Sequence, residues 1–353
     1  MAINENAWAS WAFAAAVAAP LLIGLGRWRA WLRTHLLALG DTLAAVSSRR
    51  WLILIVTTGI LLRLAWIAIY PAQAASDGAI YFSLAANLSQ GEEYVMAGSR
   101  AYWPPGYPLF LAFWFNLFSP SLGVVIALNL ALFAGAIVAV HGLANRVAST
   151  ATARLATLLI ALWPSYLCSA GLPEKELVLA FLIPLVLWLH LSISAEHRVR
   201  GRRVHLLLAG GLLGFASLVQ PSLQLFPLVL LAADLLHPQP VKLTLMRFAW
   251  IITSMLLVIS PWTLRNYQVF NEFVLISTNG GSNLYRANNS LATGGYSERG
   301  EIDLSDYDEL TQNRTGFQLA SLWISENPIR FLALAFKKQL LFLGDDSSGI
   351  YST

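Results

Sequence analysis

Two carboxylates stand beside apolar runs of the chain. Asp77 lies a few residues after the apolar run 51–70, and Glu176 directly precedes the apolar run 177–193. A carboxylate at a membrane surface can act as a general base toward an acceptor hydroxyl or amine, or it can hold a metal ion. Plainer interpretations stay open, because Asp77 is also suited to capping a helix N-terminus and charged residues at the end of a span can simply face water.

A cation and a segment rich in amides follow later in the chain. Arg265 comes shortly after Trp262, at the end of an apolar run. Its planar guanidinium suits a phosphate through charge and paired hydrogen bonds, and the alternative is that it reaches lipid headgroups. In 277–289, Gly280 and Gly281 permit close backbone approach to a ligand, and the amides can bind sugar hydroxyls or phosphate. An ordinary turn is the alternative for this segment.

The composition indicates that membrane helices position these residues. Of the 353 residues, 57% are hydrophobic and 12% are charged, whereas a soluble domain carries about 25% charged residues. Several apolar runs approach the roughly 20 residues that cross a bilayer. The 13 Trp and 11 Tyr residues fit the aromatic belts at membrane surfaces. The basic residues cluster in short loops, which is typical of cytoplasmic loops and not of a nucleic-acid surface.

Reversing direction at every span places the basic loops, such as 195–205, in the cytoplasm and the polar segments 71–105 and 264–327 outside. We expect about eight transmembrane helices, at 8–25, 51–70, 122–143, 154–168, 177–193, 206–219, 222–236 and 248–262. We also expect juxtamembrane helices on the outer face, at 79–88, 106–118 (half-inserted), 308–325 and 329–343.

This topology divides the chain into three parts. Residues 1–50 are expected to hold an N-terminal helix and a cytoplasmic linker, and 51–263 a transmembrane core with the outer loop 71–105. Residues 264–353 are expected to form an outer-face loop with amphipathic helices. Three cations interrupt 329–343, and charges in mid-span are costly, so a surface helix is favoured there.

Signals of several other functions are absent from the sequence. It has no P-loop, no dinucleotide fingerprint, no Gly-x-Ser-x-Gly and no His-rich metal cluster. Mid-span ionisable residues are scarce, with Arg63 the clearest exception, whereas an ion-coupled transporter normally needs several. The only cysteine, Cys168, cannot form a disulfide within the chain.

Taken in order, the polar motifs resemble those of the GT-C superfamily of membrane glycosyltransferases. Within it they resemble the family 39-like bacterial group, which includes protein O-mannosyltransferases and lipid A aminoarabinose transferases. The resemblance covers about residues 52–345. The matching stretches are Asp77-Gly-Ala-Ile-Tyr81, Leu84-Ala-Ala-Asn-Leu-Ser-Gln-Gly91, Trp103-Pro-Pro-Gly-Tyr-Pro-Leu109, Ser169-Ala-Gly-Leu-Pro-Glu-Lys-Glu176, Pro261-Trp-Thr-Leu-Arg-Asn266 and the segment from Gly281-Ser-Asn-Leu-Tyr285 to Asn289.

The resemblance implies a hexosyl- or pentosyltransferase with a polyprenyl-phosphate-linked sugar donor. The acceptor would be a glycolipid, polysaccharide or protein, and the reaction would invert the anomeric carbon on the non-cytoplasmic face. The protein would be a multi-pass component of the bacterial inner membrane, with membrane lipid and no nucleic acid among its partners. The resemblance gives no certain cofactor and leaves a divalent cation open. It also implies C-terminal spans that complete the fold in relatives, and we expect this chain to lack them.

The resemblance assigns roles to ten residues of this chain. Asp77 would be catalytic, deprotonating the acceptor, and Glu176 would be the second catalytic acid. The donor-phosphate ligands would be Arg265, Arg100 and Lys175, and the substrate-binding residues Tyr81, Tyr107, Asn283, Tyr285 and Asn288. Two alternatives stay open: a GT-C-like membrane scaffold without activity, and a lipid or sugar transporter.

Overall fold

The computed structural model describes residues 45–192, 199–236, 239–295 and 302–344. Within those ranges the regular structure is helical, apart from one isolated β-bridge between Met96 and Ser99. The predicted all-α class is therefore confirmed. The predicted helix 8–25 lies outside the described residues.

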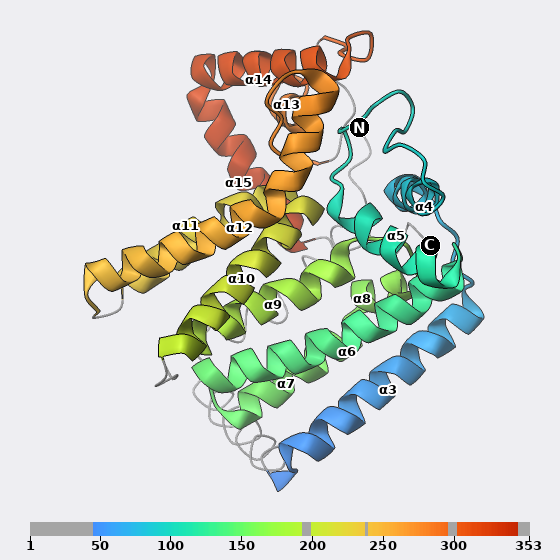
Figure 1. Ribbon diagram of the computed structural model, residues 1–353, viewed down its shortest axis with the longest axis vertical. Coiled ribbons are helices and arrows are strands. Elements are labelled where there is room, and N and C mark those ends of the chain that lie inside the picture. Colours follow the sequence, from blue (N-terminus) through green and yellow to red (C-terminus); the bar gives the residue numbers. More distant parts are fainter. Residues whose placement is uncertain (1–44, 193–198, 237–238, 296–301, 345–353) are drawn as a thin grey trace, which may run out of the picture. The chain divides into compact units, whose positions relative to one another are not determined.

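The chain divides into two compact units. Residues 47–277 form the first, which we call the helical bundle, and the described residues from 278 onward belong to the second unit. The helices of the bundle are α3 (Ser48–Ile69), α4 (Ser76–Ser89), α5 (Gly106–Phe118), α6 (Leu122–Val147), α7 (Thr150–Leu162), α8 (Pro164–Cys168), η1 (Ser169–Gly171), α9 (Glu176–Ser192), α10 (Val199–Val219), η2 (Pro221–Leu225), α11 (Phe226–Leu235) and α12 (Val241–Phe270) (Figure 1).

Among the described helices, α3, α6 and α12 are long and apolar enough to cross a membrane. α7 together with Pro164–Gly171 makes a fourth candidate if this pair, bent by 54°, counts as one span. The bend falls at Pro164, since proline disrupts a helix interior but suits a first helical turn. The remaining apolar helices of the bundle are shorter, so the predicted number of about eight spans stays a prediction.

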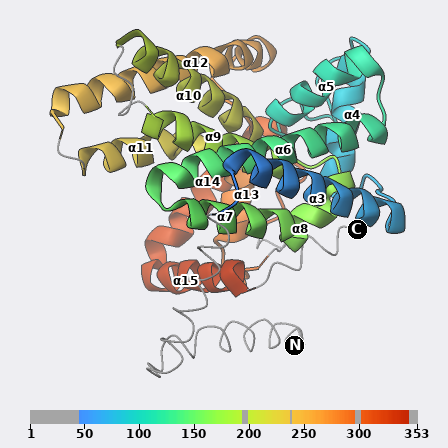
Figure 2. The ribbon, with the colours of Figure 1, turned by 90° about the horizontal axis from the view of Figure 1, so that it is seen from below.

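The spans pack as neighbours. α6 lies between α3 and α9, and α9 packs against α10, which packs against α12 (Figures 1 and 2). Small residues allow the closest approach: a Cβ added at Gly210 or Gly214 of α10 would lie 2.4 or 2.6 Å from a backbone carbonyl oxygen of α12. This spacing of two glycines four residues apart is typical of close helix pairs in membranes.

Arg63, the mid-span cation, is fully buried and has a structural role. Its Nη1 donates to the carbonyl oxygens of Gly59 and Ala161, both at 3.1 Å. Its guanidinium also lies 3.6 Å from the centroid of the Phe133 ring. These contacts join α3 to α6 and α7, and they account for an ionisable residue in a span without a transport function.

Helix α4 packs between two hydrophobic clusters of the bundle. On one side, Ile80 and Leu84 contact the cluster that contains Trp262. On the other side, Tyr81 and Ala85 belong to the cluster built on α5, α6 and α9. The helix is therefore fixed on two faces, and its N-terminal turn is held in place.

The second unit contains α13 (Gly280–Ala287), α14 (Glu309–Glu326) and α15 (Pro328–Gly344). Gly281 and Gly316 bring the backbones of α13 and α14 into contact, because a Cβ added at Gly281 would lie 1.8 Å from the Asn313 carbonyl oxygen. Asn313 Oδ1 also accepts from the Gly281 N–H at 2.8 Å. The helices predicted at 308–325 and 329–343 are confirmed as α14 and α15, and their amphipathic character and outer-face position stay predictions. Helix α13 was not predicted.

Candidate functional site

Asp77 lies in the first turn of α4 with an exposed side chain. The cap position itself is held by Ala75, which makes no side-chain cap hydrogen bond. A carboxylate in the first turn is favoured by the helix dipole. The residue before it, Ser76, has φ 48°, a left-handed conformation that costs about 1–2 kcal/mol for a non-glycine residue. Such strain often accompanies functional sites.

The loop before α9 is fixed next to Asp77. Asn129 of α6 is buried, and its Nδ2 donates to the carbonyl oxygens of Leu172 at 2.8 Å and Ala170 at 3.1 Å. A Cβ added at Gly78 would be in ordinary contact with Pro173, at 3.4 Å. The turn after Pro173 and the start of α4 are therefore neighbours, although about 95 residues separate them in the sequence.

Three carboxylates gather at this junction. Glu174 is half-buried, whereas Asp77 and Glu176 are exposed. Burial, together with the charges of Glu176 and Asp77, raises the pKa of Glu174 to about 7, against a smaller opposing effect of its hydrogen bond with Ser169. The pKa of Tyr81 is raised above its ordinary value by burial and then by Asp77, Glu176 and Glu174. The three carboxylates are therefore close enough for their charges to raise the pKa of neighbouring groups between the start of α4 and the start of α9.

The raised pKa makes the stability of the bundle depend on pH. The unfolded chain releases the Glu174 proton at a lower pH than the folded chain, so this contribution to stability is lost as pH rises through about 7. Glu174→Gln is expected to remove that decline, measured as the change in melting temperature from about pH 5 to about pH 8. Glu93→Gln, at an exposed acid, is the matched control and should keep the decline. An unchanged decline in Glu174→Gln would contradict the prediction.

A cation and two tyrosines complete this group. Lys175 Nζ lies 5.8 Å from the centroid of the Tyr81 ring, and the Tyr81 ring meets the Tyr107 ring edge-on at 5.6 Å. Tyr107 is 1% exposed, and its hydroxyl has no hydrogen-bond partner in the described part of the chain. An unpaired buried hydroxyl costs about 1–3 kcal/mol, which a ligand oxygen could recover.

The structure thus brings together five of the residues predicted from the sequence: Asp77, Tyr81, Tyr107, Lys175 and Glu176. Glu174 was missed as a site residue. The motif around it was noticed, but residue types alone do not show which of two carboxylates flanking a lysine is half-buried.

Arg265, at the outer end of α12 in the predicted topology, is engaged by the backbone. Its Nη1 donates to the Arg100 carbonyl oxygen at 2.7 Å, and its Nη2 to the Tyr94 carbonyl oxygen at 3.2 Å. The guanidinium also lies 4.8 Å from the Trp262 ring centroid. Arg265 therefore holds loop 94–100 to the end of α12, and its predicted contact with a donor phosphate stays a prediction, as does that of Arg100.

The other three predicted residues belong to the second unit. Asn283 is exposed on α13. Tyr285 and Asn288 are buried: the Tyr285 hydroxyl accepts from the Ile302 N–H, and Asn288 Oδ1 accepts from Lys338 Nζ. Both therefore support the fold of that unit, and their binding of a substrate stays a prediction.

No group of three His, Cys, Asp or Glu side chains suited to a metal ion occurs among the described residues. The three carboxylates described above are close enough to influence one another's charge, but they do not form a preassembled metal cluster.

The comparisons with known proteins rest on structure. No model of a protein family and no curated protein matches the sequence. A solved structure of the archaeal oligosaccharyltransferase AglB from Archaeoglobus fulgidus, in complex with an inhibitory peptide and a dolichol-phosphate, matches over 85% of this chain with a TM-score of 0.50 and 14% identity. The chain has a GT-C fold.

The shared GT-C fold does not extend over the archaeal enzyme as a whole, because this chain spans 35% of its length. A second structure of an Archaeoglobus fulgidus oligosaccharyltransferase, tethered with an acceptor peptide, covers 86% of this chain and 37% of that one, with a TM-score of 0.47 and 14% identity. The first match, at 14% identity, shows the fold alone, and that fold agrees with the predicted GT-C-like membrane protein.

Proposed function

We propose that the protein is a glycosyltransferase of the inner membrane, which moves a sugar from a polyprenyl-phosphate-linked donor to an acceptor on the non-cytoplasmic face. The observation that carries this proposal is the exposed carboxylate of Asp77, presented by a rigid helix beside Glu174, Glu176 and Lys175. The GT-C fold supports the class of reaction, and the sequence motifs support the family 39-like group within it.

In the proposed reaction an acceptor hydroxyl attacks the anomeric carbon of the donor sugar. Asp77 accepts the hydroxyl proton as the new carbon–oxygen bond forms, and the bond from the anomeric carbon to the phosphate oxygen breaks. The lipid phosphate leaves with the bonding electrons, on the face opposite to the attack, so the anomeric configuration is inverted. General-base assistance of this kind contributes about 10²–10⁴ to a rate.

The remaining groups stabilise charge and hold the substrates. Lys175 lies over the Tyr81 ring beside the carboxylates, and it would balance the charge on the leaving phosphate, with Arg265 and Arg100 as further candidates. Glu176 is the second proposed catalytic acid, beside Asp77. The unpaired hydroxyl of Tyr107 would bind a sugar oxygen.

The identity of the lipid that binds tests the proposal. Mass spectrometry of lipids co-purified with the protein is expected to detect a polyprenyl phosphate carrying a hexose or a pentose. The archaeal enzyme was solved with a dolichol-phosphate, a lipid of this class. The same measurement on Asp77→Asn should show more of the intact donor, because turnover is blocked. Recovery of phospholipids alone from both proteins, with no transfer from added polyprenyl-phosphate sugars, would contradict the proposal.

A further inference from the structure

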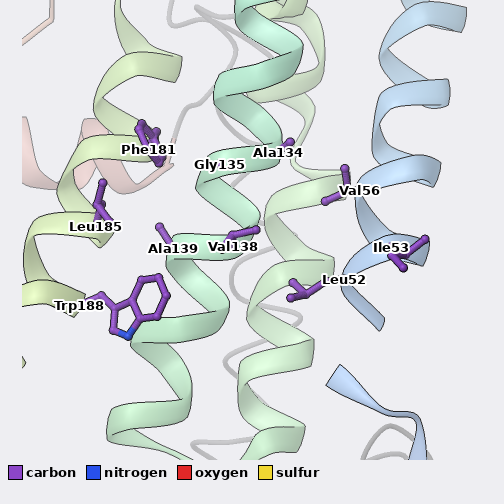
Figure 3. Close-up of a pocket in the computed structure, with 10 residues that line it drawn as sticks. All are labelled: Leu52, Ile53, Val56, Ala134, Gly135, Val138, Ala139, Phe181, Leu185 and Trp188. Carbon is purple, nitrogen blue, oxygen red and sulfur yellow. The ribbon is translucent and has the colours of Figure 1, made fainter. Parts of the chain in front are cut away.

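An apolar groove of about 460 Å³ lies on the bundle between α3, α6 and α9 (Figure 3). Its floor is α6, and α3 and α9 form its walls. The lining residues are Leu52, Ile53, Val56, Ala134, Gly135, Val138, Ala139, Phe181, Leu185 and Trp188. Gly135 lets the Phe181 ring of the α9 wall pack closely on α6, since a Cβ added at Gly135 would lie 2.9 Å from that ring.

The groove lies far from the proposed catalytic site. Its residues on α3 are near the beginning of that helix, whereas α4 and Asp77 follow the end of α3. From Val56 to Ile69 the helix rises about 20 Å. The groove is therefore a separate feature of the half of the bundle that we place in the cytoplasmic leaflet.

Arginines continue the lining toward the cytoplasmic end. Arg49 precedes Leu52, Ile53 and Val56 by three, four and seven residues, so it lies on the same face of α3 one turn nearer the helix start. On α6, Arg146 follows Ala139 by seven residues, which places it on the same side two turns beyond. Both arginines are exposed, and neither takes part in an ion pair within the described ranges.

The apolar lining and the two arginines together identify the occupant. The groove is open and lined by apolar side chains of three helices, which suits a hydrocarbon chain. The positive charges of both arginines are neutralised by an anionic headgroup but not by a zwitterionic one. Basic residues at the cytoplasmic ends of transmembrane helices favour anionic headgroups by about fivefold for each cation.

We propose that this groove is a binding site for one anionic phospholipid of the cytoplasmic leaflet. One acyl chain would lie along α6 between Leu52 and Leu185, and the phosphate would meet Arg49 and Arg146. The site is independent of the proposed sugar transfer, since no residue is shared between the two.

Native mass spectrometry of the delipidated full chain tests the proposal. Titration with phosphatidylglycerol is expected to show one lipid bound more tightly than phosphatidylcholine of the same acyl chains. The double variant Arg49→Gln/Arg146→Gln should weaken phosphatidylglycerol binding about 25-fold. Val138→Phe, which places a ring over the groove, should weaken the binding of both lipids.

Matched controls separate this site from general attraction to the membrane surface. Arg203→Gln/Lys242→Gln removes two exposed cations from the same end of the bundle, near the starts of α10 and α12, which do not line the groove, and Val229→Phe enlarges an exposed side chain of α11. Both controls should bind phosphatidylglycerol like the wild type. The proposal is overturned if the control pair loses as much affinity as Arg49→Gln/Arg146→Gln, if the two lipids bind equally to the wild type, or if folded Val138→Phe keeps full binding. The arginine pair decides the result even if Val138→Phe fails to fold.

Discussion

Asp77→Asn is expected to lower the rate of sugar transfer about 10³-fold, the size of effect expected when a general base is removed. The amide preserves the shape of the side chain but cannot accept the acceptor proton. The side chain is exposed in the first turn of α4 and the cap belongs to Ala75, so the fold should tolerate the change. The measurement is the initial rate of transfer from a polyprenyl-phosphate sugar to the natural acceptor.

Two controls make this result interpretable. Glu93→Gln is the same chemical change in the outer loop, at another exposed acid, and it should transfer sugar at the wild-type rate. The melting temperature of Asp77→Asn should match that of the wild type within a few degrees. Sugar transfer by Asp77→Asn at the wild-type rate would show that Asp77 is not the general base. Its carboxylate would then affect only the electrostatics of its surroundings.

Gly281→Ala is expected to have the largest effect on stability. Its Cβ would lie 1.8 Å from the Asn313 carbonyl oxygen, and that atom belongs to the backbone and cannot rotate away. α13 and α14 must separate, which loosens the cluster of Tyr285, Leu304 and Ala320. Overpacking of this kind costs about 3 kcal/mol. The free energy of unfolding of the second unit can be measured by pulse proteolysis in urea, with cleavage mapped to residues 278–344.

Gly295→Ala provides the matched control for that change. A Cβ at Gly295 would meet no atom within 4 Å, so the variant should unfold like the wild type. The helical bundle should resist proteolysis equally in both variants, because it is a separate compact unit. Equal stability of Gly281→Ala and Gly295→Ala would show that α13 and α14 do not cross in this way.

Much of the fold could be predicted because hydrophobicity and helix-ending residues are local signals. The helix 106–118 was predicted with the bounds that α5 has, since Pro104 and Pro105 precede it and Ser119-Pro120 follows. α12 is longer than the predicted span 248–262. Hydropathy marks the part of a helix inside the membrane, and the polar turns that continue it carry no such signal.

Helix α13 illustrates what local signals cannot show. Its Gly280-Gly281 start and its amides favour a turn when considered alone. The helix forms because α14 lies against those glycines and Asn313 accepts from the Gly281 N–H. Both partners come from about 30 residues further along the chain, so only the tertiary structure reveals them.

The candidate site likewise contains residues that local signals predict and residues that only the tertiary structure places. Asp77, Lys175 and Glu176 stood out because their charges lie at the ends of apolar runs. The half-buried position of Glu174 depends on Asn129 and on the contact of Gly78 with Pro173, which no local pattern predicts. Arg265 was predicted to meet phosphate from its type and position, and the carbonyl oxygens that it contacts come from a loop about 165 residues earlier.

The two hydrophobic contacts of α4 have an energetic consequence for substrate binding. An enzyme that presents its base from a mobile loop must order that loop in every catalytic cycle, at about 1–2 kcal/mol for each residue fixed. Asp77 instead stands on a helix anchored through Leu84 on one side and Ala85 on the other. For a loop of five residues the saving would be about 5–10 kcal/mol. The conformational freedom of the residues around Asp77 is already lost when the chain folds. Substrate binding therefore restricts the lipid donor and the acceptor and not the base.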